Sequence, residues 1–141
     1  MSEELKKGLE GVLVAESSLS YIDGDEGTLV YRGYTIDDLA RNASFEEVVY
    51  LLWHGQLPTA DELASFNSSM AAERHLDDEV LQLIRNLAEA DEEPMAALRT
   101  IVSMLSARDP DTDADPTDEA ANLRKGRRIK AKTPTALAAF T

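Results

Sequence analysis

Residues 18–40 read SLSYIDGDEGTLVYRGYTIDDLA, and this stretch decides which fold the chain is expected to begin with. Leu19 and Tyr21 alternate with small polar residues, and Leu29 and Tyr31 alternate in the same way after an Asp/Gly-rich turn. Period-two alternation on both sides of such a turn predicts a β-hairpin. A lone hairpin is only marginally stable in water, so we expect this one to pack against a larger structure.

Downstream of the hairpin, from Ile36 onward, the residue pattern predicts helices almost throughout. Capping-box sequences at 44–47 and 59–62 predict two helix starts, because Ser or Thr and a Glu three residues later satisfy each other's amide donors. Pro94 suits the first position of a further helix, where its missing N–H costs nothing. We therefore assign the chain to the mainly α class, with a small N-terminal β-hairpin followed by a multi-helix array.

The helix expected at 95–107 carries apolar residues on nearly all of its sides, among them Met95, Leu98, Ile101 and Leu105. A helix that is apolar all round is normally buried on all sides. A single small domain offers few places for such burial. A helix–helix subunit interface would supply the missing cover.

The charge balance is strongly acidic, with 27 Asp and Glu residues against 14 Lys and Arg residues and a net charge of −13. Such a field repels nucleic acids and anionic lipid surfaces, so we expect neither as a partner. Adaptation to high salt, where self-repulsion is screened, is one interpretation. The alternative is an acidic, soluble protein without any such adaptation.

The composition also indicates in which cellular compartment we expect the protein. The 141 residues fit one domain, and 43% of them are hydrophobic, as in ordinary globular proteins. The apolar run 48–53 is far too short to cross a bilayer, and the polar start lacks a signal core. There is no cysteine, which excludes disulfides and thiolate metal sites. We expect a cytoplasmic protein.

Alternating aspartates in the segment 109–118 invite comparison with a calcium loop. An EF-hand loop needs Gly at its sixth position and Glu at its twelfth. Counted from Asp109, these positions hold Ala114 and Ala120, and counts from Asp111 or Asp23 fail as well. We therefore predict a solvated acidic loop and no metal site.

A basic run follows the acidic loop, and it contains no acidic residue: Arg124, Lys125, Arg127, Arg128, Lys130 and Lys132. One interpretation is an anion site, for instance for the phosphate groups of a coenzyme. The interpretation we favour is intramolecular pairing with the preceding aspartates, because a charge run alone specifies no geometry. His54 and His75 have no acidic or nucleophilic partner nearby in sequence, and we expect both to be structural.

Several segments, taken together, are similar to the citrate synthases and their 2-methylcitrate synthase relatives. Residues 8–12 (GLEGV) and the Gly-x-Leu-x-Tyr-Arg-Gly-Tyr run at 27–34 resemble that family's amino-terminal signature. Residues 50–59 (YLLWHGQLPT), 94–100 (PMAALRT) and 132–135 (KTPT) resemble later elements in the same order. The resemblance covers nearly all of this chain but only about the first third of a full family member.

The resemblance implies a mostly helical homodimer that joins acetyl-CoA to oxaloacetate without a metal. Its catalytic histidines and aspartate belong to later segments, so we carry over no catalytic, cofactor-binding or metal-binding residue, and acetyl-CoA is a substrate rather than a cofactor held here. The helices near 77–90 and 95–107 correspond to those that build the family's dimer interface. One departure is Glu93, where many members have histidine before the Pro-Met pair.

The expected organisation is a single N-terminal portion, 1–141, of a citrate synthase-like large domain. Within it we expect an arm and hairpin (1–35), a helical core with the dimer helices (36–108), an acidic loop (109–118) and a helix cut short at its end (119–141). Alone, such a portion is expected to be inactive. The alternatives are a non-catalytic helical dimerisation module derived from the family and a fragment of a 2-methylcitrate synthase.

Overall fold

The structure, a computed structural model, describes residues 15–141. The start of the expected N-terminal arm and the 8–12 motif lie outside the described residues. The chain divides into two compact units, the first ending at Pro58 and the second beginning at Thr59. Each unit has its own packing and is described by itself.

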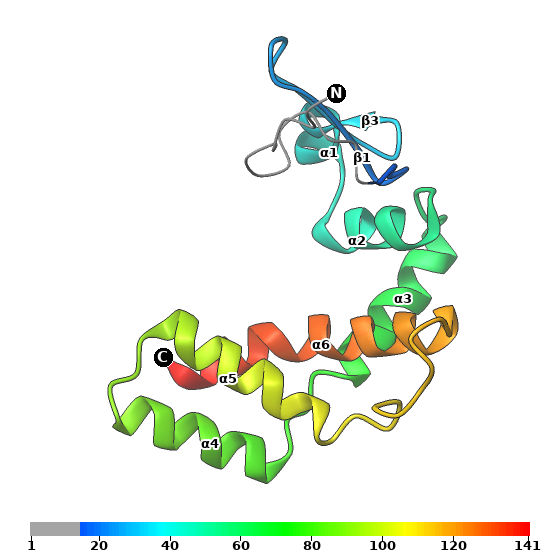
Figure 1. Ribbon diagram of the computed structural model, residues 1–141. Coiled ribbons are helices and arrows are strands. Elements are labelled where there is room, and N and C mark those ends of the chain that lie inside the picture. The colour runs from blue at the N-terminus through cyan, green and yellow to red at the C-terminus, as the bar shows by residue number, and fades with distance from the viewer. Residues whose placement is uncertain (1–14) are drawn as a thin grey trace, which may run out of the picture. The chain divides into compact units, whose positions relative to one another are not determined.

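The first unit contains the predicted hairpin, extended by a third strand. Strands β1 (Ser20–Asp23), β2 (Thr28–Tyr31) and β3 (Tyr34–Thr35) form an antiparallel sheet in the order β1-β2-β3 (Figure 1). Tyr21 pairs with Val30 across the first two strands, which confirms the hairpin. The prediction missed β3, because two residues are too few for an alternation pattern.

A tight turn joins β2 to β3, and an arginine in this turn contacts the neighbouring helix. Arg32 and Gly33 both have positive φ angles, 47° and 92°, the backbone that a two-residue hairpin turn with matching twist requires. From this turn, Arg32 Nη2 donates to the carbonyl oxygen of Leu52 at 3.2 Å, and Nη1 donates to Ser18 Oγ at 2.7 Å. Arg32 thereby ties the sheet to helix α2 (Phe45–His54).

Local signals set the ends of the helices. α1 spans Ile36–Asn42, and α2 begins at the predicted capping box and ends at Gly55, whose φ of 82° is left-handed. α3 (Ala60–Ala72) begins at the second predicted capping box. Pro94 opens α5 (Pro94–Ser106) as expected, and the preceding Glu93 accepts a hydrogen bond from the Ala96 amide. Glu93 therefore acts here as a helix cap.

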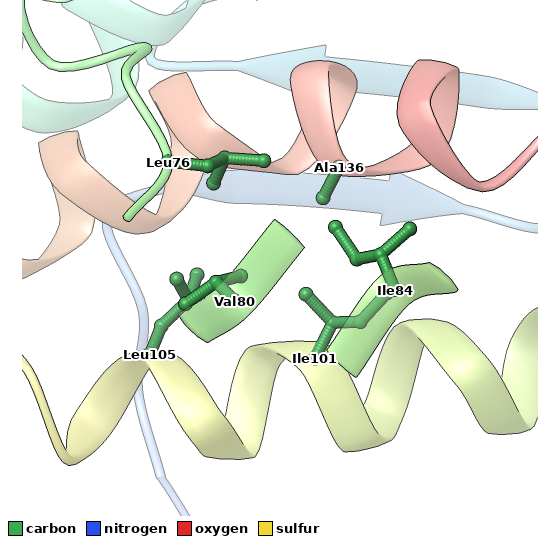
Figure 2. Close-up of a cluster of buried hydrophobic side chains, with 6 residues drawn as sticks. All are labelled: Leu76, Val80, Ile84, Ile101, Leu105 and Ala136. Atoms are coloured by element: carbon green, nitrogen blue, oxygen red, sulfur yellow. The ribbon is translucent and has the colours of Figure 1, made fainter. Parts of the chain in front are cut away.

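The second unit is built around three helices that pack on one another: α4 (Asp78–Glu89), α5 and α6 (Glu119–Phe140), with α3 against α6. Figure 2 shows their shared apolar cluster, in which side chains from α4 and α5 meet α6 and the segment before α4. Its members are Leu76, Val80, Ile84, Ile101, Leu105 and Ala136. All are at most 9% exposed.

Helix α5 is not buried all round within this one chain. Ala97, Ile101 and Leu105 are buried, whereas Leu98 is half-buried and Met95 is 67% exposed. The cluster covers only the side of α5 that faces α4 and α6. The apolar residues on the other flank remain accessible, which is the surface for which the sequence predicts an external partner.

Helix α6 covers nearly the whole segment, 119–141, for which the sequence predicts a helix. Glycine and proline are both unfavourable inside helices, yet α6 runs through Gly126 and Pro134. Its buried residues Ala121, Ala131 and Ala136 lie on either side of Pro134, which is itself exposed. Tertiary packing stabilises a helix more than propensity does, so burial of these alanines outweighs the local cost.

No helix within residues 15–141 combines the length and the apolar character needed to cross a membrane.

Candidate functional site

A cavity of about 510 Å³ lies within the second unit, beside the acidic loop that connects α5 to α6. Its walls come from the end of α3, the start of α4, the second half of α5, the loop and the middle of α6. The lining residues are Glu73, Asp77, Val102, Leu105, Ser106, Arg108, Asp109, Pro110, Thr112, Lys125, Arg128, Ile129 and Lys132.

One arginine holds the loop against α6. Arg128 Nε and Nη2 donate to the two carboxylate oxygens of Asp109 at 2.8 and 2.7 Å, and Nη2 also donates to Asp111 Oδ2. The side chains of Arg128 and Asp109 are each 11% exposed. A fork of two parallel N–H donors on one carboxylate is the strongest geometry available to an arginine ion pair.

A second arginine completes this network. Arg124 donates from Nε and Nη2 to Asp111 at 3.1 and 2.7 Å. Hydrogen bonds from Arg124, and then from Arg128, hold the pKa of the Asp111 carboxyl well below its usual range. The bond from Arg128 likewise lowers the pKa of Asp109, and the same bond raises the pKa of Arg128. All four groups are thus firmly charged near neutral pH.

Further ion pairs fix the rim of the cavity. Arg127 Nη2 lies 3.2 Å from Glu73 Oε1 at the end of α3, and Arg108 pairs with Glu79 on α4. The Lys132 ammonium donates to the main-chain carbonyl of His75. No local sequence pattern predicts these contacts, because helix packing brings the partners together.

The structure confirms the favoured interpretation of the basic run for two of its six members, since Arg124 and Arg128 pair with the preceding aspartates. The prediction of a solvated loop is wrong for Asp109 and Asp111, whose side chains are 11% and 17% exposed. Pairing to α6 removes them from water. Within the described range, no three His, Asp or Glu side chains are grouped closely enough to hold a metal ion.

Neither histidine is among the residues that line the cavity. His54 ends α2, with its ring centroid 4.2 Å from that of Tyr50. His75 lies between α3 and α4 and offers its carbonyl to Lys132. Because no histidine lines the cavity, the arrangement can bind and orient a ligand but offers no imidazole for acid–base chemistry.

Residues 8–141 match the family model described as "Citrate synthase, C-terminal domain". The chain belongs to the citrate synthase family. A citrate synthase of Haloferax volcanii is 64% identical over 99% of this chain and 37% of its own length. A 2-methylcitrate synthase of Mycobacterium tuberculosis is 43% identical over 96% of this chain and 33% of its own length.

Solved structures agree with the sequence relatives. The crystal structure of citrate synthase from Pyrobaculum aerophilum superposes with a TM-score of 0.84 at 37% identity, covering 94% of this chain and 34% of that one. The mainly α fold with a small N-terminal sheet is therefore the citrate synthase fold. This chain spans about a third of the length of the relatives it matches.

Proposed function

We propose that this chain forms the N-terminal scaffold of an enzyme that condenses acetyl-CoA with oxaloacetate to give citrate. The observation that carries the proposal is the 64% identity to the Haloferax volcanii citrate synthase across nearly the whole chain. The scaffold supplies helix packing and contributes no catalytic residue of its own. Alone, the 141-residue chain is expected to be inactive.

A chimaera tests the proposal directly. In the Haloferax volcanii enzyme, the matching segment is replaced by this chain, and condensation is assayed with oxaloacetate and either acetyl-CoA or propionyl-CoA. We expect activity with acetyl-CoA comparable to that of the parent enzyme, because the grafted helices reproduce the same scaffold. A soluble, folded chimaera without activity would contradict the proposal.

The acyl-CoA preference has a specific competitor, since a 2-methylcitrate synthase is also a relative at 43% identity. The same chimaera, assayed with both acyl-CoA substrates, tests whether this segment influences the choice of acyl group. A shift of kcat/KM toward propionyl-CoA, measured against the parent enzyme, would favour the 2-methylcitrate alternative. Unchanged preference for acetyl-CoA would favour citrate formation.

We further propose that the chain self-associates as a homodimer through α4 and α5. The accessible apolar flank of α5, with Met95 67% exposed and Leu98 half-buried, supports this proposal. A dimer would cover this flank and bury it away from water. A stable dimer formed by the chain alone, without any contribution to catalysis in the chimaera, would instead indicate a dimerisation module.

Substitution of Met95 tests the interface with little effect on the fold. Met95→Asp places an unpaired charge in the proposed contact, which costs several kcal/mol when buried, so we expect a monomer in light scattering. Asn67→Asp, an exposed addition of the same charge on α3, is the control and should leave the mass unchanged. Leu98→Asp should also dissociate the dimer but disturbs packing within the chain. An unchanged dimer mass for Met95→Asp would remove the interface proposal.

The cellular setting is also a proposal. A cytoplasmic enzyme adapted to high salt is consistent with the net charge of −13 and with the relative from Haloferax volcanii. Screening at high ionic strength would relieve the self-repulsion of so many carboxylates.

A further inference from the structure

Three residues of α6 present one face to the cavity. Lys125, Ile129 and Lys132 are spaced four and three apart, which places them on the same side of a helix, and all three line the cavity. Arg128 lies on this face too, but its guanidinium is committed to Asp109 and Asp111. The ammonium groups of the two lysines therefore set the chemistry of this wall.

Neither lysine is neutralised within the described part of the chain. No hydrogen bond or ion pair within residues 15–141 engages the half-buried Lys125 side chain. Lys132 donates to the carbonyl of His75. An ammonium has three donors, so two remain on Lys132 after this bond.

The lining carboxylates leave this positive charge uncompensated. Glu73 pairs with Arg127, and Asp109 pairs with Arg128. Asp77 precedes α4 without a capping bond from its side chain and is the one lining carboxylate that no described arginine pairs. The unpaired charges that line the cavity are therefore two lysines and one aspartate. The cavity carries an excess of positive charge, although the net charge of the chain is −13.

An apolar wall adjoins the lysines. Val102, Leu105, Pro110 and Ile129 line the same cavity, and Ile129 is 41% exposed. Pockets for small molecules combine such apolar surface with a few polar groups that fix orientation. We propose that this cavity binds a small organic anion, with its phosphate or carboxylate group on Lys125 and Lys132 and its apolar part against Val102 and Ile129.

This site is separate from the condensation proposed above, and its test needs no enzymatic activity. Phenyl phosphate is the probe, because it joins a dianion to an apolar ring. It is titrated into the 141-residue chain in KCl at which circular dichroism shows native helix content, with binding followed by calorimetry and by backbone amide chemical shifts. We expect saturable binding with shifts confined to the cavity residues of α5 and α6.

Charge variants decide which groups hold the ligand. Lys125→Gln should weaken binding by at least about tenfold, through loss of a charge-assisted hydrogen bond. Lys125→Arg should retain binding, because it keeps the charge. Asp77→Asn should strengthen binding, since it removes the one unpaired carboxylate and asparagine is still accepted before a helix. Lys130→Gln, on α6 but outside the lining, is the matched control and should bind like the parent chain.

Each contrary result overturns the assignment. Absence of saturable phenyl phosphate binding would remove the site. Equal affinity of Lys125→Gln and the parent chain for phenyl phosphate would show that Lys125 does not hold the ligand. Chemical-shift changes located away from α5 and α6 would also contradict the assignment. Inorganic phosphate binding as tightly as phenyl phosphate would show that the apolar wall plays no part, which overturns the organic-anion assignment.

Discussion

At the scale of single residues, the fork between Arg128 and Asp109 fixes the loop to α6 and makes the second unit sensitive to acid. Hydrogen bonds from arginines lower the pKa of Asp109 and Asp111 in the folded chain. The unfolded chain therefore takes up protons first as pH falls, so the contribution of these carboxylates to stability is present above their unfolded pKa of about 4 and is lost below it.

Replacement of Arg128 tests this network. Arg128→Gln should lower the free energy of unfolding by about 2 kcal/mol at neutral pH, because it removes charged hydrogen bonds and leaves two carboxylates facing each other. Thermal melts between neutral pH and acid should then show a smaller loss of stability on acidification than in the parent chain. Arg124→Gln, at an exposed site, should have a much smaller effect. Parallel pH profiles for Arg128→Gln and the parent would contradict the account.

Arg32 plays the corresponding part in the first unit. Arg32→Asn keeps a residue that tolerates positive φ but removes the bonds to Leu52 and Ser18. We expect a loss of about 1 kcal/mol, seen as faster amide hydrogen exchange in β1 and β2. Ser18→Ala removes only the exposed contact and should change exchange less. Unchanged protection in Arg32→Asn would mean that the sheet does not depend on this link.

At the scale of elements, the close approach of α6 to α4 and α5 depends on a small side chain. Ala136 is 0% exposed within the cluster. Ala136→Leu should destabilise the second unit by about 1–3 kcal/mol, through overpacking. Ala138→Leu makes the same chemical change at an exposed position of α6 and should be nearly neutral. Chemical denaturation measures both, and equal midpoints would show that the packing at Ala136 is loose.

Elements whose signals are local could be predicted from the sequence, and those that depend on distant contacts could not. Ser44 with Glu47, Gly55 and Pro94 act within one helical turn, so their motifs give the helix ends directly. The continuity of α6 through Pro134 depends on burial of its alanines against other helices. The cavity depends on segments as distant in sequence as 73 and 132. The order of the motifs along the chain was enough to predict the family. No local pattern, however, indicates that a lysine lies unpaired in a cavity.

At the scale of the whole molecule, the excess of acidic groups opposes compaction. The charge of −13 repels itself in dilute salt, and the repulsion is screened as the Debye length falls to about 3 Å at 1 M salt. The fork between Arg128 and Asp109 is 11% exposed on both sides, so salt weakens it less than it weakens repulsion between exposed carboxylates. The balance predicts that added salt stabilises the chain.

A melting series in KCl tests this balance. We expect the midpoint of thermal unfolding to rise from dilute buffer to about 2 M KCl, because screening removes repulsion in the folded chain first. Chloride is preferred to sulfate, which strengthens apolar burial in any protein. The variant Glu89→Gln, Asp91→Asn, Asp113→Asn changes the net charge from −13 to −10 at exposed sites. It should melt higher than the parent in dilute buffer and gain less from KCl. If the parent melts at the same temperature throughout the series, charge repulsion does not limit its stability, and the proposed adaptation to salt fails with it.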